Sequence, residues 1–112
     1  MNLLESIYYK GIKIETWVWT QPATGPAQIC CEADGKVNLN EKAKKILKEN
    51  ADQEIYFSGG RIYNPTENSY FLYKRVIDNY IPKHDDKNQA TKERLIMKLK
   101  SFVDEAEQYL EN

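Results

Sequence analysis

The chain has 112 residues, of which 41% are hydrophobic and 29% charged, and its formal net charge at pH 7 is −1. A chain of this length forms one domain around one core, and its apolar fraction argues against intrinsic disorder. The net charge argues against constitutive nucleic-acid binding, since the chain has no overall positive field to attract phosphates. No apolar run approaches the ~20 residues of a membrane span, and the N-terminus lacks a signal-peptide pattern, so we expect a cytoplasmic protein with no membrane partner.

Residues 6–33 alternate with a period of two and are rich in Ile, Val, Tyr, Trp and Thr, which predicts β-strands. Lys10-Gly11 is typical of a hairpin turn, and the Pro- and Gly-containing segment 21–26 predicts a loop. Trp17 and Trp19 fall on the strand face that otherwise carries Lys13 and Glu15. We therefore expect these two indoles either to lie under a second layer or to form an exposed patch.

The only two cysteines, Cys30 and Cys31, are adjacent in the expected strand that ends at Ala33. Neighbouring side chains of a strand point to opposite faces, so the two thiols are poorly placed to bond each other. A metal or redox pair would need two residues between them. We expect one buried thiol and one half-exposed thiol.

A helix is expected at residues 40–50. Asn40 can cap its first turn, Glu41 suits the positive end of the helix dipole, and Ala43, Ile46 and Leu47 repeat at helical spacing. The remaining surface of this helix is rich in lysine. A charged helix face of this kind usually meets water, and the alternative is a docking surface for an acidic partner or a phosphate. The lysines of this face are Lys42, Lys44, Lys45 and Lys48.

Residues 54–63 predict a hairpin around Ser58-Gly59-Gly60, because glycines supply the positive φ angles of a primed turn. Glycine amides together with Arg61 could also hold a phosphate while Tyr56 or Tyr63 stacks on a base. No helix and no Lys-Ser/Thr pair follows the glycines, so the sequence favours the plain turn.

Residues 65–80 fit two structures. Asn64, Pro65 and Glu67 resemble the cap and first turn of a helix, and Leu72 and Val76 belong to an apolar stripe at helical spacing. The aromatic run at 70–73 and the turn residues at 64–68 fit a pair of strands instead. Because cap and stripe agree, the sequence favours the helix.

From residue 88 to residue 110 apolar side chains recur every three or four positions without Gly or Pro, which predicts a long helix docked on the sheet. The predicted fold is a single α+β domain over residues 1–112. It has an antiparallel sheet of four to six strands with the 40–50 helix and the 88–110 helix packed on it.

No constellation of catalytic residues stands out in the sequence. The single histidine, His84, lies beside Asp85 and Asp86 in a polar segment, and no second histidine or cysteine stands at metal-ligand spacing. We therefore expect a protein that is not an enzyme and that needs no metal or other cofactor.

The chain contains 8 Tyr and 2 Trp but only 3 Phe, which favours aromatics that combine an apolar body with a polar group. Such residues are enriched at protein interfaces. We expect a protein-binding module, an inhibitor or regulator of a larger protein, of the kind that small accessory proteins of bacteria and phages provide. The partner bound by the aromatic patch could also be a second copy of the chain, which would give a homodimer. The expected binding residues are Trp17, Trp19, Lys42, Lys44, Lys45, Lys48 and Arg61, and a ligand site at the Gly-Gly turn is the alternative.

Overall fold

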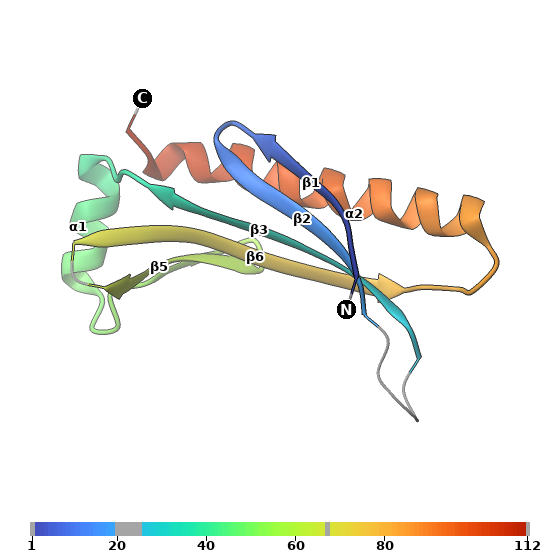
Figure 1. The fold of residues 1–112 in the computed structure, drawn as a ribbon. Helices are drawn as coiled ribbons and strands as arrows, with labels where there is room; N and C mark the ends of the chain where they lie inside the picture. The colour runs from blue at the N-terminus through green and yellow to red at the C-terminus, as the bar shows by residue number, and fades with distance from the viewer. Residues whose placement is uncertain (1, 20–25, 67, 112) are drawn as a thin grey trace.

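The computed structural model describes residues 2–19, 26–66 and 68–111, so the expected loop at 21–26 lies almost wholly outside the described residues. Within them the strands form one sheet of order β1-β2-β3-β6-β5-β4, and every neighbouring pair is antiparallel (Figure 1). This confirms the predicted α+β fold. The elements are β1 (Asn2–Tyr9), β2 (Ile12–Trp19), β3 (Gln28–Val37), α1 (Glu41–Glu49), β4 (Ile55–Phe57), β5 (Gly60–Thr66), β6 (Ser69–Asn79), α2 (Asp85–Ala106) and a 3-10 turn, η1 (Glu107–Tyr109).

The order of elements is symmetrical. Three strands and a helix are followed by three strands and a helix, and the last strand of each half, β3 and β6, pair at the centre of the sheet. Each half begins with a tight hairpin, and both turns have two residues of positive φ: Lys10 and Gly11 in the first, Ser58 and Gly59 in the second. In the second turn Gly60 is already the first residue of β5, so the turn uses Ser58-Gly59 and not the Gly-Gly pair.

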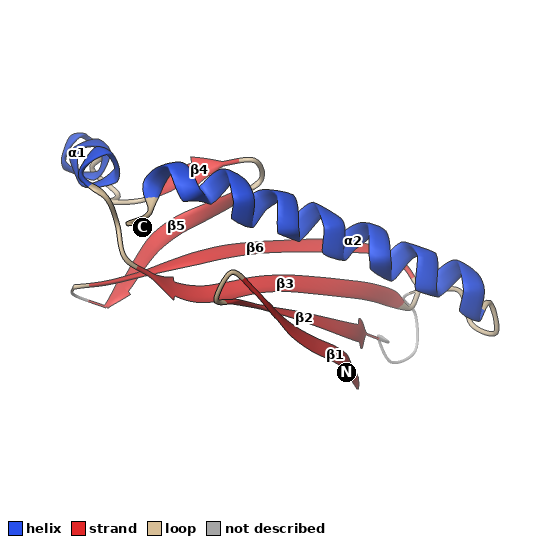
Figure 2. Ribbon diagram, turned by 90° about the horizontal axis from the view of Figure 1, so that it is seen from above, coloured by secondary structure: helices blue, strands red, loops and turns tan. Residues whose placement is uncertain are grey.

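The long helix α2 covers one face of the sheet and leaves the other uncovered by any described helix (Figure 2). Its buried stripe includes Leu95, Leu99 and Phe102, each at most 1% exposed, which pack on the side chains of the covered face. One row of residues on that face crosses five strands, because residues that are paired across neighbouring strands point to the same face. It consists of Ile12, Gly35, Leu72, Ile62 and Ile55.

Helix α1 starts where the sequence predicts. The Asn40 side chain accepts a hydrogen bond from the Ala43 amide at 2.9 Å, which satisfies one of the unpaired donors of the first turn. Ala43 and Leu47 are buried, and the Asn40 side-chain amide donates to the Gln108 carbonyl at 2.8 Å. These contacts hold α1 against η1, the 3-10 turn that directly follows α2.

The helix expected at 65–80 is absent, because this segment forms the end of β5 and the whole of β6. Asn68, at φ 69, occupies the hairpin turn, and Thr66 pairs with Ser69, while Glu67 lies outside the described residues. The apparent helical stripe combined two faces of a strand. Because Lys74 and Asp78 share the helix-covered side with Leu72 and Val76, the alternation expected of a strand was hidden.

Candidate functional site

The uncovered face of the sheet is a continuous surface built from all six strands. Cross-strand partners point to the same face, so the pairing register assigns its side chains row by row. One row crosses the whole sheet and consists of Tyr8, Lys13, Asp34, Tyr73, Arg61 and Tyr56. Next to it run the rows Ser6, Glu15, Glu32, Arg75 and Leu3, Trp17, Cys30, Ile77, followed by Trp19, Gln28, Asn79.

Seven aromatic side chains lie on this face. Tyr8 and Tyr56 at its two edges are 73% and 63% exposed, whereas those between them are half-buried. The Tyr63 ring lies 6.2 Å from that of Phe71 and 6.4 Å from that of Tyr73. The full set is Tyr8, Trp17, Trp19, Tyr56, Tyr63, Phe71 and Tyr73.

The structure places the two predicted tryptophans at one end of this face. Trp17 and Trp19 are half-buried by their neighbours, and no described helix lies over them. The Arg75 guanidinium lies 5.8 Å from the Trp19 ring centroid, a cation–π contact that the sequence did not reveal. Arg75 reaches this tryptophan from β6 only because β3 and β6 are paired, so no local signal could have identified it.

Cys30 belongs to the same face, yet it is only 2% exposed, and Cys31 on the covered face is 0% exposed. The expectation of one half-exposed thiol was therefore wrong. The Arg75 Nε donates to the Cys30 sulfur at 3.0 Å, and Trp17 stands beside it in the pairing register. Large side chains cover the thiol although no helix does. Burial raises the pKa of the Cys31 thiol, which keeps that group neutral.

Three of the four cations on the described strands of this face are paired with carboxylates, and the fourth, the exposed Lys36 opposite Phe71, forms no ion pair with a described residue. Lys13 lies 3.4 Å from Glu15, the Arg75 Nε 3.5 Å from Glu32, and the Arg61 guanidinium 3.0 Å from Glu54. Arg61 also stacks over Tyr63 at 4.5 Å. Burial, with the nearby Glu32 carboxylate, raises the pKa of Tyr73, so its hydroxyl stays protonated. The face is therefore aromatic and close to charge-neutral.

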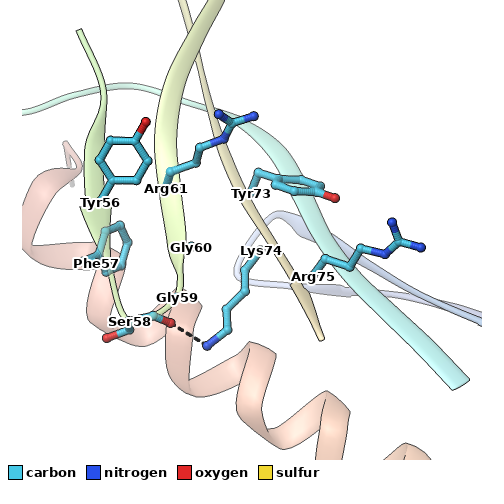
Figure 3. A pocket seen from close by; sticks show the side chains of 9 residues that line it. All are labelled: Tyr56, Phe57, Ser58, Gly59, Gly60, Arg61, Tyr73, Lys74 and Arg75. Carbon is cyan, nitrogen blue, oxygen red and sulfur yellow. Dashed lines mark hydrogen bonds between the residues drawn. The ribbon is translucent and has the colours of Figure 1, made fainter. Parts of the chain in front are cut away.

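A cleft of about 580 Å³ opens at the edge of this face, where the β4–β5 hairpin ends and β6 continues (Figure 3). The Lys74 ammonium donates to the Ser58 carbonyl at 2.6 Å across its floor, and the Ser58 hydroxyl donates to Glu105 of α2. Three cations and no carboxylate line the cleft. Its lining is Tyr56, Phe57, Ser58, Gly59, Gly60, Arg61, Tyr73, Lys74 and Arg75.

The predicted lysine surface lies elsewhere. It is on α1, at the end of the sheet opposite to the end at which β2 reaches Trp19, as both views show (Figures 1 and 2). Lys42 contacts the Tyr109 ring at 5.3 Å and Lys44 lies 3.4 Å from Glu41, while Lys45 and Lys48 are exposed. The sheet therefore brings Trp17, Trp19 and Arg61 to one face and does not bring the lysines to it.

The described residues contain no group of three or more His, Cys, Asp or Glu side chains that could hold a metal ion. His84 is exposed at the start of α2, and Asp85 and Asp86 lie in the first turn of that helix. Among the helices of the described part of the chain, none is long and apolar enough to cross a membrane.

Comparison with protein-family models, curated proteins and solved structures finds no match for this chain.

Proposed function

We propose that this chain is a protein-binding module whose contact surface is the uncovered face of the sheet, and that it inhibits or regulates a larger protein. The observation that carries the proposal is the composition of this face. Aromatic side chains gather on it, and Lys13, Arg61 and Arg75 are each paired with a carboxylate. Nucleic-acid binding would instead need several cations that are free to contact phosphates, whereas among the described residues of this face Lys36 alone has no ion pair.

Aromatic residues with a polar group are the commonest anchors of protein interfaces, because they exclude a large apolar area and still offer a hydrogen bond. Trp17 and Trp19 lie on β2, which is paired with a strand on each side and so holds their backbone in place, and little conformational entropy is lost when a partner covers them. The lysines of α1 lie outside this contact surface and would act by steering an acidic partner toward it.

The experiment that tests the proposal is affinity purification of the tagged protein from its native cell, with mass spectrometry of the captured proteins. The same purification is repeated with the variants Trp17→Ala and Trp19→Ala. The control variant is Met97→Ala, which removes a 60% exposed apolar side chain from α2. A stoichiometric partner that is lost with the tryptophan variants and kept with the Met97 variant supports the module. Absence of any partner, or equal capture by all variants, would argue against it.

A second candidate function has its own observation. The cleft beside Ser58-Gly59 combines three cations with Tyr56 and Tyr73, a set that suits an aromatic ligand with a phosphate. Against it, Arg61 is already paired with Glu54. The test is a thermal-shift series with nucleotides, second messengers and inorganic phosphate, since a ligand at 100 times its dissociation constant adds about 2.7 kcal/mol to the free energy of unfolding. A shift that Arg61→Ala abolishes would support a ligand site.

A further inference from the structure

The central strand β6 has a free edge over half of its length. On one side β3 pairs with it from Tyr70 to Asn79. On the other side the register with β5 ends at Tyr73, because β5 begins at Gly60. Residues 74–79 are therefore paired on one side only within the described chain, and Figure 1 shows β6 running on past the β4–β5 hairpin.

The backbone groups of this edge point outward. The Tyr80 amide donates to the Ala27 carbonyl at 3.0 Å, which fixes the phase of the β3–β6 ladder. Alternate residues of an antiparallel strand direct their amide and carbonyl groups to opposite sides. Arg75 and Ile77 therefore direct theirs away from β3, as Tyr73 does where β5 is present to pair with it.

The next outward amide along β6, that of Asn79, is already hydrogen-bonded to a side chain instead of to a strand. The Asn79 amide donates to the side chain of Asp78 at 2.7 Å, and this hydrogen bond, together with Arg94, lowers the pKa of the Asp78 carboxyl. A side chain therefore occupies the end of the edge, while the positions of Arg75 and Ile77 are left for a strand.

The surroundings of the edge select the side chains of an incoming strand. On its helix-covered side lie Lys74, Arg94 and Lys98, where Arg94 pairs with Asp78 and no described carboxylate forms an ion pair with either lysine. On its uncovered side lies Ile77, which is 43% exposed, between Asn79 and Arg75, and the Arg75 guanidinium is already held by Cys30 and Glu32. The edge thus presents two lysines without ion pairs toward α2, and toward the other side it presents the apolar Ile77 beside a cation that is already paired.

We propose that β6 binds an extended acidic segment of a partner protein as an added strand, in line with β5 and antiparallel to β6. Its acidic side chains face Lys74 and Lys98, its apolar side chains lie on Ile77, and its C-terminal end enters the cationic cleft beside Ser58-Gly59. Strand addition of this kind takes affinity from backbone hydrogen bonds and specificity from alternate side chains. It rests on the proposed function in that the occupant is a protein.

The test uses the full chain and a fluorescein-labelled heptapeptide of alternating Glu and Val that ends in Glu. Fluorescence anisotropy measures its binding, and amide hydrogen exchange reports on Arg75 and Ile77. We expect binding that slows exchange of these two amides and that weakens about tenfold or more when Lys replaces Glu. No binding at about 1 mM peptide would overturn the proposal.

Two N-methylated peptides determine whether backbone pairing carries the binding. In the antiparallel arrangement, the residues that exchange hydrogen bonds with Arg75 and Ile77 share their face, and these are the valines. N-methylation of the valines should therefore abolish binding, and N-methylation of the glutamates should leave it within about threefold. Equal effects of the two peptides would show that the contact is not a strand pairing.

Matched variants of the protein repeat the test from its own side. Ile77→Pro removes the outward amide without removing a described ladder bond, and Ile77→Thr keeps it. Binding lost in the first and kept in the second supports the proposal, and if Ile77→Pro fails to fold, the two methylated peptides decide. If Arg75 and Ile77 are protected in a dimer without peptide, a second copy is the occupant and the proposal is wrong. Partner capture that depends on Trp17 and Trp19 without peptide binding would overturn this inference alone.

Discussion

The ring of Phe57, at the end of β4, lies stacked on the ring of Phe102 from α2, with the centroids 4.7 Å apart and the planes 15° from parallel. This contact joins the small β4–β5 hairpin to the long helix, and it leaves no room beneath it. A Cβ atom at Gly60 would stand 2.5 Å from the Phe102 ring and 2.7 Å from the Tyr73 carbonyl oxygen.

Gly60→Ala is therefore expected to destabilise the protein by about 1–3 kcal/mol, because both the ring and the backbone must move to admit one methyl group. The free energy of unfolding in urea measures the effect. Gly59→Asn is the matched control in the same turn, since Asn tolerates a positive φ and a side chain there meets only Lys74 at ordinary contact distance. Comparable stability of the two variants would contradict the packing described.

Phe102→Ala should cost about 3–5 kcal/mol, since the side chain is 1% exposed and its removal leaves a cavity against Phe57. This is a large part of the ~5–15 kcal/mol that stabilises a domain of this size. Phe102→Leu should cost less, because most of the apolar volume remains. A chain that ends at Lys87 lacks nearly all of α2 and is expected not to fold cooperatively. A sharp thermal unfolding transition in that shortened chain would contradict this expectation.

The sequence predicted those parts of the fold in which local pattern and tertiary environment agree. The Lys10-Gly11 turn, the Asn40 cap and the apolar stripe of α2 each carry their signal within a few residues. In β6 the pattern failed, because Lys74 can point to the helix-covered face: its ammonium donates to the Ser58 carbonyl and lies 5.5 Å from the centroid of the Phe102 ring.

The candidate site was predictable in part for the same reason. Trp17 and Trp19 follow from the alternation of one strand, and the structure places both on the face opposite α2. The contribution of Arg75 depends on the pairing of β3 with β6, and the free edge depends on where β5 begins relative to β6. Both are relations between strands that are distant in sequence, so no period or motif carries them.

Asn88 is expected to be essential for the connection between β6 and α2. It is 8% exposed, its side-chain oxygen accepts from the Ile81 amide at 2.9 Å, and its side-chain nitrogen donates to the Ile81 carbonyl at 2.7 Å. Asn88→Ala leaves both backbone groups without these partners and should cost about 1–3 kcal/mol or more in chemical denaturation. Gln89→Ala, which removes an exposed hydrogen bond from the next position, should change stability by less than about 0.5 kcal/mol.

Thiol reactivity tests the packing of the uncovered face without any partner. With Cys30 2% exposed and Cys31 0% exposed, neither should react with a thiol reagent in the native protein at a rate near that of the unfolded chain. Arg75→Ala removes a side chain that contacts the Cys30 sulfur, so it should speed labelling of Cys30 and leave Cys31 unreactive. Mass spectrometry of the labelled peptides distinguishes the two residues, and rapid labelling of both in the parent protein would contradict the structure.

Acid should weaken the contact between the first hairpin and α2. Lys10, followed by the Tyr9 hydroxyl, holds the pKa of Asp104 below its usual value, and the contacts of Lys10 with Asp104 and Glu107 raise the pKa of Lys10. A carboxyl whose pKa is lower in the folded state stabilises the protein fully above its unfolded pKa of about 3.9, and this contribution is lost as pH falls through the folded pKa. Lys10 stays charged throughout that range.

The difference in free energy of unfolding between the parent protein and Asp104→Asn should therefore be constant near neutral pH and shrink below about pH 4. Urea titrations at several pH values measure it, and a difference that is independent of pH would show that Asp104 does not stabilise the fold through its charge.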